Sequence, residues 1–201
     1  AGTQNRGPLL DRLDDSRARR PVVVEAALLL TLAGQRVLVL GLGISGRSAA
    51  RFCAQRGARV LAADERPAAA ISGLETLPPE VELQLGAAFP DASGFDLVVP
   101  SPGVPRERWA RRARQAWGDL ELAYRALDVP IIAITGTKGK STTTTLTARM
   151  LERAGFQVTV GGNIGAPLSA QVEESTPETL HVVEASSFQL EGIEHFRPWI
   201  A

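Results

Sequence analysis

Short apolar runs rich in leucine and β-branched residues alternate with helical stretches from Arg36 onward. This alternation is typical of βαβ units whose strands form a parallel sheet. A helix is predicted over 45–56, because Gly57 follows it as a helix-ending glycine. Strands are predicted over 37–40, 58–63, 81–85 and 96–99. The pattern therefore predicts one α/β module in the first half of the chain.

The second half of the chain takes up the same pattern after a break. Residues 105–127 are charged, carry a few apolar anchors and predict a helical segment, which Asp128-Val129-Pro130 interrupts. Strands over 131–134, 157–160 and 180–184 follow, with a helix over 141–154. We therefore expect three parts, namely a poorly ordered extension at 1–33, a first module at 34–127 and the start of a second module at 128–201.

The first glycine-rich loop is Gly41-Leu42-Gly43-Ile44-Ser45-Gly46, which fits G-x-G-x-x-G between a strand and a helix. Glycines allow the tight turn, the approach of backbone to a phosphate and close packing of the helix on the sheet. The motif predicts a Rossmann-like module, and leaves open NAD(P), a flavin, another nucleotide or a structural turn. Asp64, at the end of the next strand, could accept hydrogen bonds from a ribose or a base, or simply be solvated.

The second glycine-rich loop, Gly136-Thr137-Lys138-Gly139-Lys140-Ser141, also joins a strand to a helix. It departs from the full G-x-x-x-x-G-K-[ST] pattern, because Ile134 stands where the first glycine is required. Its chemistry still suits a triphosphate. Backbone N–H groups can surround the phosphates, Lys140 can neutralise their β and γ groups, and the Ser141 hydroxyl can reach Mg²⁺. We therefore predict a P-loop ATPase-like second module.

Glu184 ends the strand at 180–184 and precedes Ala185-Ser186-Ser187. Mg²⁺ in such folds is held by a carboxylate at the carboxyl end of a strand beside the P-loop strand. The spacing leaves a metal-binding role and a capping or solvated role open.

The composition of the chain limits the binding partners and cellular location that can be expected. Basic and acidic residues number 22 each, which gives no sign of nucleic acid or an anionic membrane as a general partner. The single cysteine, Cys53, falls within an apolar helical pattern, so we expect a buried thiol in the reducing cytoplasm. The apolar run 22–32 follows three arginines, but Glu25 interrupts it and it is far shorter than the ~20 residues of a membrane span. We therefore reject a signal peptide and expect no stable membrane association.

Taken together, several segments of residues 34–201 resemble the Mur ligases, and within that family the branch that adds D-glutamate. The short loop T-G-T-x-G-K-S-T is characteristic of the family, and E-x-S-S-F-Q-L-E favours the D-glutamate branch. The matching segments are Val37 to Gly46, Ala63 to Arg66, Ser101-Pro102-Gly103, Ile134 to Thr142, Gly161 to Gly165, and Glu184 to Leu190.

The resemblance implies an ATP-dependent ligase that uses Mg²⁺ and joins D-glutamate to UDP-N-acetylmuramoyl-L-alanine through an acyl phosphate, working as a monomer in cell-wall synthesis. It implies that Lys140 and Glu184 are catalytic, and that Ser141 and Glu184 bind the metal. For ATP it implies Gly136, Thr137, Lys138, Gly139, Lys140, Ser141 and Thr142. For the substrate it implies Ile44, Ser45, Asp64, Glu65, Arg66, Ser101, Gly103, Asn163, Ser186 and Gln189.

The chain departs from the family pattern in two places. Lys138 stands where the family usually has asparagine, and the chain stops before the family's histidine-containing metal loop and third domain. His181 and His195 match no family motif, so we expect packing or surface histidines. Because part of the active site is missing, we expect this chain to be inactive alone. The alternatives are another Mur ligase, a folate polyglutamate ligase, and a nucleotide-binding module without ligase chemistry.

Overall fold

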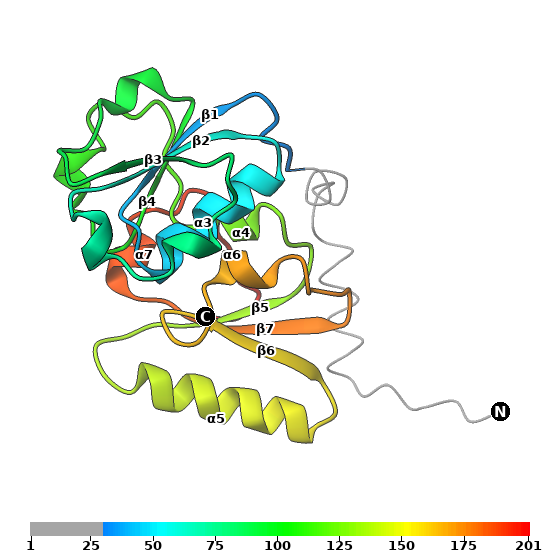
Figure 1. The fold of residues 1–201 in the computed structure, drawn as a ribbon. Coiled ribbons are helices and arrows are strands. Elements are labelled where there is room, and N and C mark those ends of the chain that lie inside the picture. Colours follow the sequence, from blue (N-terminus) through cyan, green and yellow to red (C-terminus); the bar gives the residue numbers. More distant parts are fainter. Residues whose placement is uncertain (1–29) are drawn as a thin grey trace.

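The computed structural model describes residues 30–201, and they form two parallel β-sheets stacked on a shared layer of helices (Figure 1). The first sheet has the order β3-β2-β1-β4. Its strands are β1 Arg36–Leu40, β2 Arg59–Asp64, β3 Glu82–Leu85 and β4 Leu97–Pro100. Helix α3 connects β1 to β2, and short 3₁₀ turns fill the other connections. They are α3 Ile44–Gln55, η1 Ala68–Ala70, η2 Leu74–Thr76, η3 Ala92–Gly94 and η4 Arg106–Arg108.

The second sheet has the order β5-β7-β6, and all its pairings are parallel. Its strands are β5 Ile131–Ile134, β6 Gln157–Gly162 and β7 Thr179–Glu184. The helices of this half are α5 Lys140–Arg153, α6 Leu168–Gln171 and α7 Ser187–Leu190. Helix α5 lies on the side of this sheet that faces away from the first module (Figure 1). The predicted α/β class and the parallel sheets are confirmed.

The layer between the sheets consists of α3, α6 and α4 (Asp119–Tyr124), and one hydrophobic cluster runs through it from Val37 in the first sheet to Val183 in the second. Polar contacts join the same helices. The buried Asp119 carboxylate accepts a hydrogen bond from the Leu168 backbone N–H (2.9 Å), although burial raises its pKa. The modules are thus joined by packed helices rather than by a bare linker.

Residues 105–127 differ from the predicted helical segment. Only 119–124 form an α-helix, while 106–108 form a 3₁₀ turn and Ala116 bridges to Val98 beside β4. The two tryptophans explain the difference. Trp109 packs in the cluster on one face of the first sheet, and Trp117 in the cluster on the other face. The chain must cross the sheet edge between them, which a continuous helix does not do.

The boundaries of the parts are less sharp than the expected ranges. Leu32 is fully buried, and its backbone N–H donates to the Arg56 carbonyl (3.1 Å), so packing of the first module begins before residue 34. The rest of the expected extension, residues 1–29, lies outside the described residues. The boundary at 127/128 stays a prediction, since α4 contacts both modules. Among residues 30–201, no helix is long and apolar enough to cross a membrane.

Candidate nucleotide-binding sites

The first glycine loop lies at the carboxyl ends of β1 and β2, where α3 begins. Gly41 has a left-handed φ of +80°, and its N–H donates to the Ala63 carbonyl of β2 (2.8 Å). A Cβ atom on Gly46 would lie 1.8 Å from the Gly41 carbonyl oxygen, so only glycine fits there. The Ser101 hydroxyl, which follows β4, donates to the same oxygen (2.7 Å). The loop is therefore held between three neighbouring strand ends.

Asp64 fixes this loop through its carboxylate, which is 5% exposed. One oxygen accepts from the Leu42 backbone N–H (2.7 Å) and the Arg66 Nη2 (2.7 Å), and the other accepts from the Arg66 N–H (2.9 Å) and Nε (3.0 Å). The Arg66 side chain, followed by these backbone donors, holds the pKa of Asp64 well below its usual range despite its burial. Both oxygens are thus already engaged by the protein, whereas the sequence suggested that they could serve a ribose or a base.

A cavity of about 570 Å³ opens above this loop. Sequence reasoning missed Phe89 and Arg108, which also line it. Arg108 pairs with Glu65, and its guanidinium carbon lies 5.4 Å from the centre of the Phe89 ring. Neither residue belongs to a sequence motif that could have revealed it. The expected substrate-binding residues that line the cavity are Ile44, Ser45, Asp64, Glu65, Arg66, Ser101, Gly103 and Asn163.

A second cavity, of about 640 Å³, lies between the two modules. Ser186 and Gln189, the remaining expected substrate residues, line it. Their side chains also cap α7, since Ser186 Oγ accepts from the Gln189 N–H (3.2 Å) and Gln189 Oε1 accepts from the Ser186 N–H (2.9 Å). The residues that line both cavities are Ser101, Pro102, Gly103, Val104, Pro105 and Asn163. An elongated ligand can therefore extend from the first glycine loop toward the second module.

The second glycine loop lies at the carboxyl end of β5 and leads into α5. Gly136 and Gly139 have positive φ angles of +142° and +77°, which turn the backbone around the loop. The Lys140 ammonium folds back over the loop and donates to the Gly136 carbonyl (3.0 Å). Apart from the half-buried Lys140, the loop residues, Lys138 and Ser141 among them, are exposed, so their donors face solvent. Exposed backbone N–H groups at the start of a fourteen-residue helix make this loop suited to an anion.

Glu184 lies beside this loop, because the last residue of β7 pairs with Ile134, the last residue of β5. Its side chain is 1% exposed. One carboxylate oxygen accepts from the Asn163 side-chain amide (2.7 Å), and the other is buried with no partner among the described residues. An unpaired buried carboxylate oxygen is costly unless a ligand completes it. The donor set fits a Mg²⁺ ion shared with phosphate oxygens, although no group of three or more His, Cys, Asp or Glu residues in 30–201 could hold a metal.

Neither histidine lines either cavity, and only His181 is packed inside the protein, whereas His195 is exposed. His181 is buried in β7, where it hydrogen-bonds to the Ser175 hydroxyl (2.7 Å) and the Gln171 side chain (3.2 Å). Burial lowers its pKa to about 4, so the ring is neutral near pH 7. The His195 backbone N–H donates to Glu121 (2.9 Å).

These features define a class of protein, namely a two-module α/β protein with a glycine loop between a strand and a helix in each module and two adjoining cavities beside the first loop. Residues 35–118 match the model of the N-terminal domain of MurD-like Mur ligases, and residues 134–200 match the model of the Mur ligase middle domain. The chain therefore belongs to the Mur ligase family.

Curated relatives carry the name UDP-N-acetylmuramoylalanine–D-glutamate ligase. The one from Anaeromyxobacter dehalogenans is 51% identical over 178 residues, which is 85% of this chain and 38% of the relative. The one from Geobacter metallireducens is 44% identical over 180 residues, which is 86% of this chain and 40% of the relative. The chain thus spans about two fifths of the length of these relatives.

Among solved structures, a pseudomurein peptide ligase type C from Methanothermus fervidus is 22% identical to this chain, with a TM-score of 0.42. The match covers 77% of this chain and 33% of the ligase. At that TM-score the match adds nothing to the family assignment.

Proposed function

We propose that this chain is the substrate- and ATP-binding part of an ATP-dependent ligase that joins D-glutamate to UDP-N-acetylmuramoyl-L-alanine. The observation that carries the proposal is the pair of separate glycine loops, one per module. Two adjoining cavities share Ser101, Gly103 and Asn163. They extend from the first loop to Asn163, which donates to Glu184 beside the second loop (2.7 Å). A hydride-transfer enzyme needs one dinucleotide loop, whereas a ligase must bring a nucleotide substrate and ATP together. The names of the curated relatives support the same reaction.

The first module would bind the uridine diphosphate of the substrate. The N-terminus of α3, with Ile44 and Ser45, faces the 570 Å³ cavity, where backbone N–H groups and the helix dipole favour a diphosphate. Glu65 and Arg66 would lie near the uridine, with Asp64 holding Arg66 in place. The remainder of the substrate would follow the shared wall into the 640 Å³ cavity, past Ser186 and Gln189.

The second module would bind ATP on residues 136–142. Lys140 would leave the Gly136 carbonyl and place its charge on the β and γ phosphates. Glu184 and Ser141 would hold Mg²⁺, which supplies positive charge to the phosphate oxygens. The substrate carboxylate would take the γ-phosphoryl group and release ADP. The D-glutamate amine would then attack the acyl carbon, expel phosphate and lose a proton, leaving an amide. Lys140 would stabilise the charge that develops during these steps.

A nicotinamide cofactor is the alternative that the first glycine loop raises. In dinucleotide-binding proteins, an acidic residue at the position of Asp64 usually binds the ribose. Here both oxygens of Asp64 accept hydrogen bonds from Leu42 and Arg66. This arrangement favours the UDP substrate over NAD⁺. The cytoplasmic location, the monomeric state and the absence of nucleic-acid and membrane partners stay predictions.

Calorimetry on the 201-residue chain tests the proposal. UDP-N-acetylmuramoyl-L-alanine should bind with a micromolar Kd, ATP with Mg²⁺ should bind at the same time, and NAD⁺ should give no heat. The two ligands should bind simultaneously, because each is expected on the glycine loop of a different module. Micromolar NAD⁺ binding with no response to the UDP substrate would refute the ligase assignment.

A further inference from the structure

Residues 185–198 leave the second sheet, cross to the first module and return. They start after Glu184 of β7, form α7, and come back to β5, where the Trp199 N–H donates to the Ile131 carbonyl (2.8 Å). On the way they supply one wall of the 640 Å³ cavity, lined by Ser186, Phe188, Gln189, Glu191 and Gly192. The position of this wall therefore depends on what holds the crossing segment against the first module.

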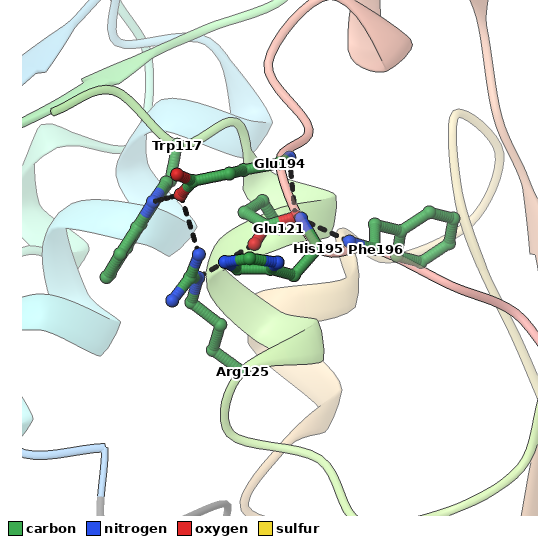
Figure 2. Close-up of polar contacts among 6 residues, drawn as sticks. All are labelled: Trp117, Glu121, Arg125, Glu194, His195 and Phe196. Atoms are coloured by element: carbon green, nitrogen blue, oxygen red, sulfur yellow. Dashed lines mark hydrogen bonds and ion pairs between the residues drawn. The ribbon is translucent and has the colours of Figure 1, made fainter. Parts of the chain in front are cut away.

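A buried carboxylate accepts three of the hydrogen bonds that hold this segment. Glu121, in α4, is fully buried, and its Oε2 accepts the backbone N–H groups of Glu194 (2.9 Å), His195 (2.9 Å) and Phe196 (2.7 Å) (Figure 2). Three consecutive N–H groups that converge on one oxygen form an anion-binding nest, here filled by a side chain of the same protein. Its Oε1 accepts from Arg125 Nε (2.7 Å).

Neighbouring contacts complete this arrangement, which we call the Glu121 clasp (Trp117, Glu121, Arg125 and residues 194–196). Arg125 Nη2 and Trp117 Nε1 both donate to Glu194 Oε2, at 2.7 and 3.0 Å (Figure 2). The Arg125 guanidinium carbon lies 4.1 Å from the centre of a Trp117 ring, which adds a cation–π contact. Arg125 thus pairs with both carboxylates of the clasp, the buried Glu121 and the more exposed Glu194.

The wall is also tied directly to the first module next to the clasp. The Gly118 N–H donates to the Gly192 carbonyl (2.7 Å), and a Cβ atom on Gly192 would lie 2.8 Å from the Gly118 nitrogen. Gly118 and Gly192 both line the cavity. Backbone from the two modules therefore meets at the floor of the cavity, three residues before Glu121 and two before Glu194.

We propose that Glu121 is a positioning residue for the substrate, because it fixes the 186–192 wall against the wall formed by 100–107. The proposal rests on the proposed function, in which the uridine diphosphate occupies the 570 Å³ cavity and the sugar–alanine arm reaches the 640 Å³ cavity. Glu121 contacts neither cavity, so it would act only on the arm and only through residues 186–192.

The substitution Glu121→Gln keeps the shape of the side chain but replaces one of its two acceptor oxygens by an NH₂ group. A carboxylate offers acceptors to both the three N–H groups and Arg125, whereas an amide has one oxygen and must turn its NH₂ group toward donors on one side. In either orientation of the amide, the three backbone N–H groups or the Arg125 side chain therefore lose their acceptor. Glu173→Gln is the matched control, because Glu173 forms an exposed ion pair with Arg56 (2.6 Å) and lines neither cavity.

The test compares two ligands on the 201-residue chain by calorimetry. In Glu121→Gln, the Kd of UDP should change by less than about twofold, and the Kd of UDP-N-acetylmuramoyl-L-alanine should rise by about tenfold, since a displaced wall misplaces the arm alone. Hydrogen exchange should be faster at residues 187–196 and unchanged in α5. Glu121→Asp, which keeps the charge on a shorter side chain, should fall between wild type and Glu121→Gln, and it carries the comparison if Glu121→Gln does not fold.

Equal weakening of UDP and of the full substrate would overturn the proposal, because a merely structural role loosens both cavities together. So would an unchanged Kd for the full substrate alongside faster exchange at 187–196. If the wild-type chain bound neither ligand, the proposed function would fail instead, and exchange at 187–196 in Glu121→Gln would still decide whether Glu121 holds this wall.

Discussion

Replacing Asp64 by asparagine distinguishes a structural role from a purely ligand-binding one. The carboxylate joins the first glycine loop to the end of β2, through the Leu42 N–H at 2.7 Å and the Arg66 N–H at 2.9 Å. Asparagine retains one acceptor oxygen and presents an NH₂ group in place of the other. Whichever way the amide turns, its NH₂ group faces one of these two backbone N–H groups, which then has no acceptor, and for the Leu42 N–H that loss is the more costly.

The magnitude follows from the burial of Leu42, which is 0% exposed. A buried donor left unsatisfied costs about 1–3 kcal/mol. The guanidinium contacts add little, because the Arg66 side chain is 53% exposed and solvent screens the pair. A loss of about 2 kcal/mol lowers the Tm of a domain of this size by about 4–8 °C. Glu65→Gln is the control, since its ion pair with Arg108 is exposed on both sides and contributes at most about 1 kcal/mol.

Thermal unfolding followed by circular dichroism measures both variants. The pKa of Asp64 is depressed in the folded state, so its contribution is present above the unfolded pKa near 3.9 and is lost as pH falls toward the folded value. The difference in Tm between wild type and Asp64→Asn should therefore be constant from about pH 6 to 8 and shrink below about pH 4. If Asp64→Asn and Glu65→Gln unfolded at the same temperature, the structural role assigned to Asp64 would be wrong.

Two further predictions concern other residues. In a complete enzyme, Lys140→Ala should lower turnover by about 10²–10³-fold, because it removes the cation aimed at the β and γ phosphates, while Lys138→Asn should retain most activity; equal impairment in steady-state assays would contradict the roles assigned within this loop. Burial raises the pKa of the Cys53 thiol to about 12, so alkylation by iodoacetamide at pH 8 should require unfolding, and rapid labelling of the folded chain by mass spectrometry would contradict that burial.

The strands and the glycine loops could be predicted from sequence because their signals are local. Val37 to Leu40 and Ile131 to Ile134 are apolar runs followed directly by glycine motifs, and the structure places β1 and β5 there. The steric need for Gly46 is likewise local, since it involves the Gly41 carbonyl five residues earlier. Parallel pairing then brings the ends of neighbouring strands to one edge, which is why residues as distant as Ile44 and Ser101 line the same cavity.

The short helices were missed for the opposite reason. Helix α6 has four residues and is held by contacts with α3 and α4 rather than by its own periodicity. Helix α7 is equally short, but its sequence does carry a signal, because Ser186 and Gln189 have the spacing of a capping box. That pattern could have placed the helix and shown that both side chains also serve the backbone.

Two buried glutamates show why roles cannot be assigned from sequence alone. Glu121 and Glu184 are both almost fully inaccessible, and both follow apolar residues in regular structure. Every carboxylate oxygen of Glu121 has protein donors, which satisfies its charge and makes it a structural anchor. Glu184 has one oxygen on Asn163 and one with no partner among the described residues. Because a buried anion must be compensated, the free oxygen requires a partner that the described part of the chain does not supply. Its place beside the second glycine loop supports the proposed Mg²⁺ site. This distinction between the two glutamates depends on tertiary contacts that no spacing of residues records.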